Sequence, residues 1–125
     1  MFDGVTHVVA SAPPGGDGDP VLKQCRDIFV ARAGQFQWLA YLSTTGVYGD
    51  HGGGWVTEDT PLTPNTGRGE KRLQAERQWL ALWHSHGLPV HLFRLAGIYG
   101  PGRNQLVSIL DGTATVDALA ARAAQ

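Results

Sequence analysis

The chain has 125 residues, which bounds it to one domain with a core of reasonable size. Ten basic and eleven acidic residues give a formal net charge of −1, and no long run of either sign points to nucleic acid or an anionic membrane. The single cysteine, Cys25, cannot form an internal disulfide, which is typical of a reducing compartment. No apolar stretch approaches the roughly 18 residues of a membrane span. The amino terminus MFDGVTHVV lacks the features of a signal peptide, so we expect a cytoplasmic protein.

Apolar periodicity and glycine or proline breaks predict an alternating series of elements. The predicted elements are strands at residues 4–12, 38–43 and 89–95, a helix from Pro20 to near Gly34, a helix at 69–84, and a weak helical pattern at 105–110. Asp19 is the expected N-cap of the first helix, and Cys25 is expected in its buried stripe. The second helix is expected to place Leu73, Leu80 and Trp83 on its apolar side.

This order of strands and helices is typical of a parallel sheet with helices on both faces, because parallel neighbours need a long crossover. In such sheets ligands bind beyond the carboxyl ends of the strands. Polar or glycine-rich segments follow all three predicted strands, at residues 11–16, 43–50 and 96–104. The sequence therefore predicts an α/β fold with a ligand site at the strand ends.

Three hydroxyl side chains, Ser43, Thr44 and Thr45, end the second predicted strand. Such a cluster either caps the strand locally or faces a ligand. We expect Thr44 to lie in a ligand pocket. Ser43 and Thr45 either satisfy local backbone groups or take another role, and the sequence leaves these alternatives open.

Three segments in order carry a family resemblance: SAPPGGDGDPVL, then YLSTTGVYGDHGGGWVTEDTPLTPNTGRGEKRLQAE, then FRLAGIYGPGRN. Over residues 5–104 the chain resembles the middle of an extended short-chain dehydrogenase/reductase of the NAD-dependent epimerase/dehydratase group. The most specific pieces are STTGVYG and RLAGIYGPG. The resemblance implies that residues 1–104 form part of a Rossmann-type, doubly wound parallel sheet that binds NAD(P), with 105–125 as a helical or poorly ordered tail.

The resemblance also implies catalytic positions. Thr44 takes the place of the residue that orients the substrate oxygen, and the usual Tyr-x-x-x-Lys pair falls on Arg68 and Arg72. Neither residue matches the pair. A guanidinium stays protonated, so Arg68 cannot shuttle a proton as a phenol does, whereas Arg72 can still donate hydrogen bonds to a ribose or phosphate. The chain therefore resembles atypical members of the group.

The implied cofactor is NAD or NADP. The residues that the resemblance assigns to it are Ser11, Ala12, Pro13, Arg72, Ala96, Gly97 and Ile98. The G-x-G-x-x-G loop that holds the pyrophosphate in the family does not occur in this sequence. GGDG at residues 15–18 lacks the required spacing and is expected to be a mobile loop. The chain therefore resembles a fragment of the family's cofactor domain, and we do not expect it to bind the cofactor well by itself.

Two functions follow from these observations. In the first, the complete protein is an NAD(P)-dependent oxidoreductase or epimerase acting on a sugar nucleotide or a similar carbonyl or hydroxyl compound, and this chain is inactive alone. In the second, it is a non-catalytic dinucleotide-binding or scaffold protein of the same fold. The expected partner is a small-molecule substrate, with no nucleic acid and no membrane. The strand at residues 4–12 would present an unpaired edge, which favours a homodimer or other self-association.

The remaining candidate residues have mainly structural interpretations. The five histidines are scattered and do not indicate a metal site. Trp79 and Trp83 are expected in or near the core, and Tyr99 is expected to shape the turn after the third strand. Arg94 either pairs with an acid or approaches the site, and the sequence leaves these alternatives open.

Overall fold

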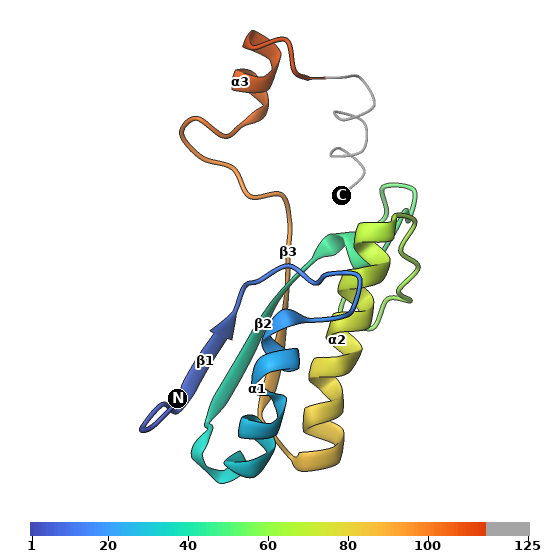
Figure 1. Cartoon of the computed structure of the whole chain (residues 1–125). Coiled ribbons are helices and arrows are strands. Elements are labelled where there is room, and N and C mark those ends of the chain that lie inside the picture. The colour runs from blue at the N-terminus through green and yellow to red at the C-terminus, as the bar shows by residue number, and fades with distance from the viewer. Residues whose placement is uncertain (115–125) are drawn as a thin grey trace.

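The structure is a computed structural model that describes residues 1–114 (Figure 1). Its elements are β1 (His7–Ala10), α1 (Pro20–Ala31), η1 (Ala33–Gln35), β2 (Trp38–Thr44), η2 (Thr45–Val47), α2 (Gly67–His86), β3 (Val90–Leu95) and α3 (Gln105–Leu110), where η marks a short 3-10 helix. The predicted α/β order is confirmed. Residues 115–125 of the predicted tail lie outside the described residues. Within the described part, no helix has both the length and the hydropathy to cross a bilayer.

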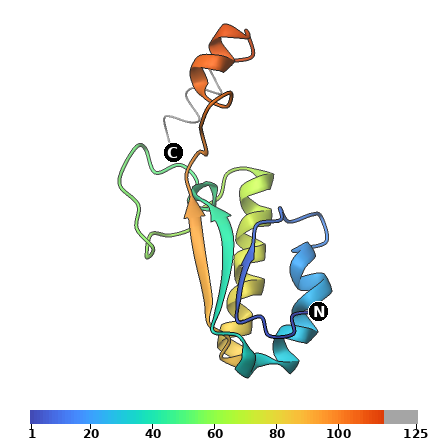
Figure 2. The ribbon, with the colours of Figure 1, turned by 90° about the vertical axis from the view of Figure 1, so that its left-hand side faces the viewer.

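The strands form one three-stranded sheet with β2 in its centre. Both neighbours run parallel to β2, with Ala10 opposite Tyr41 and Thr44 opposite Leu95. The carboxyl ends of the strands therefore meet at one end of the sheet, at the top of Figure 2. The predicted parallel sheet is confirmed.

Both long helices, α1 and α2, cover the same face of the sheet (Figure 2). The expectation of helices on both faces is wrong for residues 1–114. The reason is the handedness of the connections. The crossovers from β1 to β2 and from β2 to β3 step across the sheet in one direction, and right-handed crossovers in one direction place their helices on one face.

The core lies between this face and the two helices. Leu39 and Tyr41 of β2, Phe29 of α1 and Trp79 of α2 are completely buried. The Trp79 ring stacks on Tyr41 at a centroid distance of 5.8 Å and contacts Phe29 at 5.9 Å. Offset and tilted aromatic pairs of this kind add to the free energy gained from burial. Cys25 is buried in the same cluster, as its place in the α1 stripe predicts.

The buried face of α2 differs from the predicted stripe. Leu73 is buried as expected, but Leu80 is only partly buried and Trp83 is 52% exposed. The buried row instead runs through Glu76 and Trp79. Because the charged Glu76 lies in the middle of this buried row, the row does not show an apolar helical period in the sequence. This is why the sequence pattern assigns Leu80 and Trp83 to the buried side.

Local sequence signals predict the start of α1 correctly but not its end. Asp19 caps the helix by accepting a hydrogen bond from the Leu22 amide at 2.9 Å, and Pro20 occupies the first turn, as predicted. The α-helix ends at Ala31, before the expected Gly34, because the chain tightens into η1.

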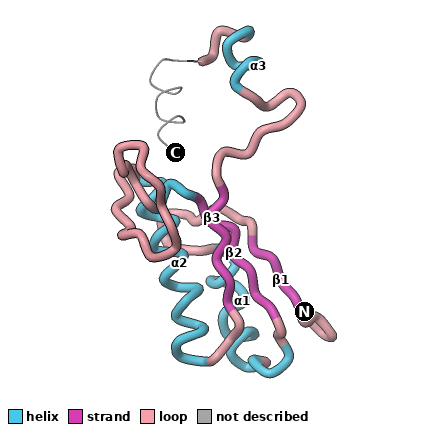
Figure 3. The backbone as a smooth tube through the Cα atoms, turned by 180° about the vertical axis from the view of Figure 1, so that it is seen from behind, coloured by secondary structure: helices cyan, strands magenta, loops and turns pink. Residues whose placement is uncertain are grey.

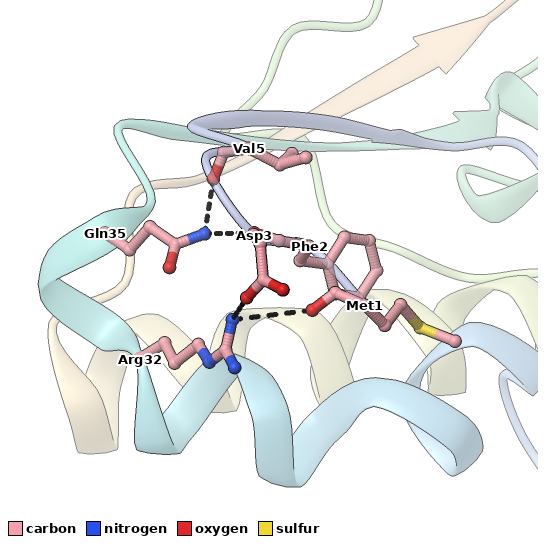
Figure 4. Close-up of polar contacts among 6 residues, drawn as sticks. All are labelled: Met1, Phe2, Asp3, Val5, Arg32 and Gln35. Atoms are coloured by element: carbon pink, nitrogen blue, oxygen red, sulfur yellow. Dashed lines mark hydrogen bonds and ion pairs between the residues drawn. The ribbon is translucent and has the colours of Figure 1, made fainter.

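β1 is shorter than the predicted strand at residues 4–12. On its carboxyl side, Pro13 and Pro14 have no amide hydrogen to donate to a ladder. On its amino side, residues 1–5 form a loop that folds toward the end of α1 (Figure 4). There Arg32 donates a hydrogen bond to Asp3 at 2.6 Å, and Gln35 donates one to the Val5 carbonyl at 2.8 Å. This loop is fixed to the helix layer and cannot extend the sheet.

The second face of the sheet is covered by none of the described helices, and α3 stands apart from it (Figure 3). Val9 on this face is 56% exposed and Phe93 is 42% exposed. Trp38 stacks on His91 at 5.9 Å and lies 5.9 Å from Phe93, so an aromatic row crosses β2 and β3. An exposed apolar face with strand edges beside it promotes association.

We propose that the 125-residue chain by itself self-associates through this face. Replacing Val9 and Phe93 together by lysine is expected to yield monomer, because association would then bury two charges. The control is Trp55→Lys, since Trp55 is fully exposed in the loop before α2 and lies off the sheet. Size-exclusion chromatography with light scattering measures the mass. A monomeric unsubstituted chain, or equal masses for both variants, would contradict the proposal.

Candidate functional site

A cavity of about 650 Å³ lies at the carboxyl ends of the strands. Its lining comes from the last residues of β2 and β3, from the segments after β1 and β3, and from the first two turns of α2. The lining residues are Ser11, Pro13, Pro14, Leu42, Ser43, Thr44, Arg68, Lys71, Arg72, Leu95, Ala96, Gly97, Ile98 and Arg103. The structure thus has a cavity beyond the strand ends, where the sequence predicts the ligand site.

A second cavity of about 830 Å³ adjoins the first, between the start of α2 and α3. The two share a wall, which consists of Thr44, Arg68, Ala96, Gly97, Ile98 and Arg103. We call the two cavities together the strand-tip cleft.

Most of the sequence-predicted site residues line this cleft. Thr44, Arg68 and Arg72 line the first cavity, as do all the predicted cofactor residues except Ala12. Lys71 and Arg103 also line it, and sequence reasoning missed both of them. The signal for Lys71 was its place between the two arginine positions, three residues after Arg68 on the same side of a helix.

The three hydroxyl side chains at the end of β2 differ in their hydrogen bonds. Thr44 Oγ1 accepts a hydrogen bond from the Gly46 amide at 3.2 Å and so caps η2. Ser43 Oγ and Thr45 Oγ1 are buried and have no hydrogen-bond partner among the described residues. Of the roles left open for Ser43 and Thr45, a hydrogen bond to a local backbone group is therefore not the one seen within residues 1–114. Thr44 fills that local role and still lines the cleft with a hydroxyl that retains its own proton to donate.

The sequence leaves open whether Arg94 pairs with an acid or approaches the site. In the structure it pairs with an acid. Its guanidinium donates to both carboxylate oxygens of Glu76, at 3.1 and 2.9 Å. It also donates to the Tyr48 hydroxyl at 3.1 Å and lies over that ring at 5.0 Å. Hydrogen bonding to Glu76 raises the pKa of Arg94 above its ordinary value, although burial acts in the opposite direction.

Arg72 ties α2 to the end of β2. Its guanidinium donates to the Leu42 carbonyl at 2.9 Å and to the Tyr41 hydroxyl at 3.1 Å. Burial raises the pKa of Tyr41, and the hydrogen bond from Arg72 opposes that rise. Arg72 thus has a structural role in this chain, at the position where the resemblance places the catalytic lysine.

The start of α2 is pressed against η2, and Gly69 permits this contact. A Cβ atom at Gly69 would lie 2.8 Å from the Gly46 carbonyl oxygen and 3.0 Å from Pro64 Cβ. The Gly69 amide also donates to Thr66 Oγ1 at 3.0 Å, which caps the helix. Gly69 therefore sets how closely the basic first turn approaches the strand ends.

Metal ligation finds no support in the described residues. Among residues 1–114 no group of three or more histidine, cysteine, aspartate or glutamate side chains lies close enough to hold a metal ion.

A parallel sheet with crossover helices and a cleft at its strand ends defines part of a Rossmann-type α/β domain. Residues 22–122 match the sequence profile of the NAD dependent epimerase/dehydratase family. The chain belongs to this family.

Comparison with curated proteins and solved structures agrees with this assignment. Protein YeeZ from Escherichia coli strain K12 and from O157:H7 is 38% identical over 94 residues, which are 71% of this chain and 32% of each relative. A functionally unknown conserved protein from Silicibacter pomeroyi is 58% identical with a TM-score of 0.77, over 83% of this chain and 36% of that chain. The dTDP-glucose 4,6-dehydratase from Bacillus anthracis, solved in complex with NAD, is 27% identical with a TM-score of 0.69, over 86% and 38% of the two chains. The chain spans about a third of the length of its curated relatives.

Gly69→Ala is expected to lower the free energy of unfolding by about 1–3 kcal/mol, because the methyl group overpacks the contact between α2 and η2. Gly67→Ala is the matched control in the same helical turn, since a Cβ there meets no atom within 4 Å. We expect it to be neutral or stabilising by up to about 1 kcal/mol. Urea unfolding followed by tryptophan fluorescence measures both. Equal losses in the two variants would show that the close approach does not stabilise the fold.

Proposed function

We propose that this chain supplies the later strands of the cofactor domain of a cytoplasmic NAD(P)-dependent oxidoreductase or epimerase. Its substrate would be a sugar nucleotide or a similar carbonyl or hydroxyl compound. The observation that supports this most is the cleft, which gathers the predicted cofactor residues other than Ala12 at the strand ends in a chain of this family. The solved dehydratase that binds NAD has the same local fold.

The residues present fit one end of such a dinucleotide. Leu42, Leu95 and Ile98 give the first cavity apolar walls, and Ser11 and Thr44 add hydroxyl groups, a combination suited to a flat ring with polar substituents. When bound, the nicotinamide ring supplies or accepts a hydride. The G-x-G-x-x-G loop for the pyrophosphate does not occur in these 125 residues. We therefore expect the chain alone to be inactive.

Within this proposal, Thr44 directs its hydroxyl proton to a substrate oxygen. The oxygen of Thr44 is engaged by the Gly46 amide, which leaves the hydroxyl hydrogen as the group to donate. Arg68 lines the same cavity, but a guanidinium is suited to donating hydrogen bonds and not to general acid/base catalysis. Proton transfer would need another group.

A non-catalytic dinucleotide-binding or scaffold role is the second candidate. It is favoured by Arg72, whose guanidinium is held by the Leu42 carbonyl and the Tyr41 hydroxyl. A residue fixed in this way supports the fold at a position where a catalytic lysine would contact the cofactor.

Titration of the full-length protein with NADH and NADPH, followed by nicotinamide fluorescence, tests the proposal. We expect saturable binding of at least one dinucleotide. Gly97→Leu should weaken it at least about tenfold, since the side chain would enter the cavity. Gly34→Leu is the control, because Gly34 is remote from the cleft and a Cβ there meets no atom within 4 Å. If neither NADH nor NADPH binds, the enzyme function and the dinucleotide-binding role are both refuted. Only a scaffold role would then remain.

The double substitution Arg68→Tyr with Arg72→Lys separates the two candidates. Reductase activity gained by this variant would show that these positions are the altered acid/base pair of an enzyme site. Dinucleotide binding that persists with no activity in either protein would favour the non-catalytic role.

A further inference from the structure

We propose that the strand-tip cleft holds a carboxylate or phosphate group of the substrate between Arg68, Lys71 and Arg103. This inference rests on the proposed function and narrows its substrate class to anionic compounds. It follows from the charge of the lining, from the absence of internal partners for these side chains, and from their placement.

The first cavity has a strongly cationic wall. Arg68, Lys71, Arg72 and Arg103 line it, and its lining contains neither aspartate nor glutamate. The chain as a whole has ten basic and eleven acidic residues, so composition does not account for this concentration. Asp111 lines the second cavity only.

Three of these cations have no counter-charge within residues 1–114. The ion pairs in that range are Lys23–Asp17, Arg32–Asp3 and Arg94–Glu76. Arg72 donates to protein oxygens, whereas Arg68, Lys71 and Arg103 form neither ion pairs nor side-chain hydrogen bonds with residues 1–114. Gathered cations of this kind repel one another, and a bound anion would relieve that repulsion.

The cations approach the cavity from two directions. Arg68 and Lys71 lie three residues apart in the first turns of α2, and Arg103 comes from the loop after β3. The amino-terminal end of α2 adds its partial positive charge on the same side. Ser43, which is 5% exposed and whose Oγ has no partner among the described residues, lines this cavity as well.

The chemistry of these groups selects the ligand. Arginine forks match the paired oxygens of carboxylates and phosphates, and lysine adds a point charge. All of these cations come from α2 and the loop after β3, and none comes from the segment after β1. They line the same cavity as Thr44, and Arg68 is at the position of the usual tyrosine, which places the anion at the reacting end of the cleft. We therefore assign it to the substrate.

The test uses inorganic phosphate and malonate as probes, titrated into the ¹⁵N-labelled full-length protein at constant ionic strength and followed by NMR. We expect shifts at Arg68, Lys71 and Arg103. Affinity should fall at least about tenfold in the Arg68→Gln/Lys71→Gln variant and in Arg103→Gln. Arg77→Gln is the matched control, because Arg77 is an exposed arginine of α2 outside both cavity linings. Equal loss in the control variant, or no binding of either probe, would overturn the inference.

A second arm repeats the titration in the presence of saturating NADH. Simultaneous binding of phosphate and NADH supports the substrate assignment. Displacement of phosphate by NADH would overturn it, because the anion site would then belong to the cofactor. NADH binding without any anion binding refutes this inference alone. Anion binding at the three residues without NADH binding refutes the proposed function and leaves the anion site in place.

Discussion

The ion pair between Arg94 and the buried Glu76 determines how the parts of the cleft are held together. Glu76 is 1% exposed and lies in the middle of α2, while Arg94 is 16% exposed and lies on β3, at one edge of the described sheet. Burying two charges is costly, and the cost is offset only when the geometry satisfies their hydrogen-bonding groups. Here both carboxylate oxygens are engaged, and the remaining contact reaches Tyr48 beyond η2. One guanidinium thereby joins β3, α2 and the turn after β2.

This arrangement explains why the basic first turn of α2 lies over the strand ends. Arg94 fixes the middle of α2, Arg72 fixes its second turn to the Leu42 carbonyl, and Gly69 allows its start to touch η2. Arg68 and Lys71 form neither ion pairs nor side-chain hydrogen bonds with residues 1–114, and both line the cleft. Where the resemblance places a proton-transfer pair, this chain thus has cations suited to fixing charge.

Much of the fold could be predicted from local sequence signals. Asp19 and Pro20 mark the start of α1 by a mechanism that needs no tertiary contact, and the two motifs STTGVYG and RLAGIYGPG locate the cleft. The rest depends on long-range pairing. From the sequence alone, Glu76 is expected to be a surface carboxylate, because nothing local indicates that Arg94 of β3 pairs with it. Its charge also interrupts the apolar row that identifies the buried face of α2. Ser43 and Thr45 cannot be distinguished from Thr44 by sequence, because only the geometry of η2 decides which hydroxyl receives the Gly46 amide. Arg103 reaches the cavity only through the path of the loop after β3.

A double-mutant cycle on Arg94 and Glu76 measures whether this pair organises the cleft. Arg94→Met is expected to lower the free energy of unfolding by about 3–5 kcal/mol, since it leaves the buried Glu76 carboxylate without its partner. Glu76→Met is expected to cost less, about 1–3 kcal/mol, because Arg94 is partly exposed and keeps its contact with Tyr48. The double variant should lose far less than the sum, with a coupling free energy of about 2 kcal/mol or more. Urea unfolding of the four proteins gives these values. Losses below about 0.5 kcal/mol that simply add would contradict the account, because the pair would then behave as two independent surface groups.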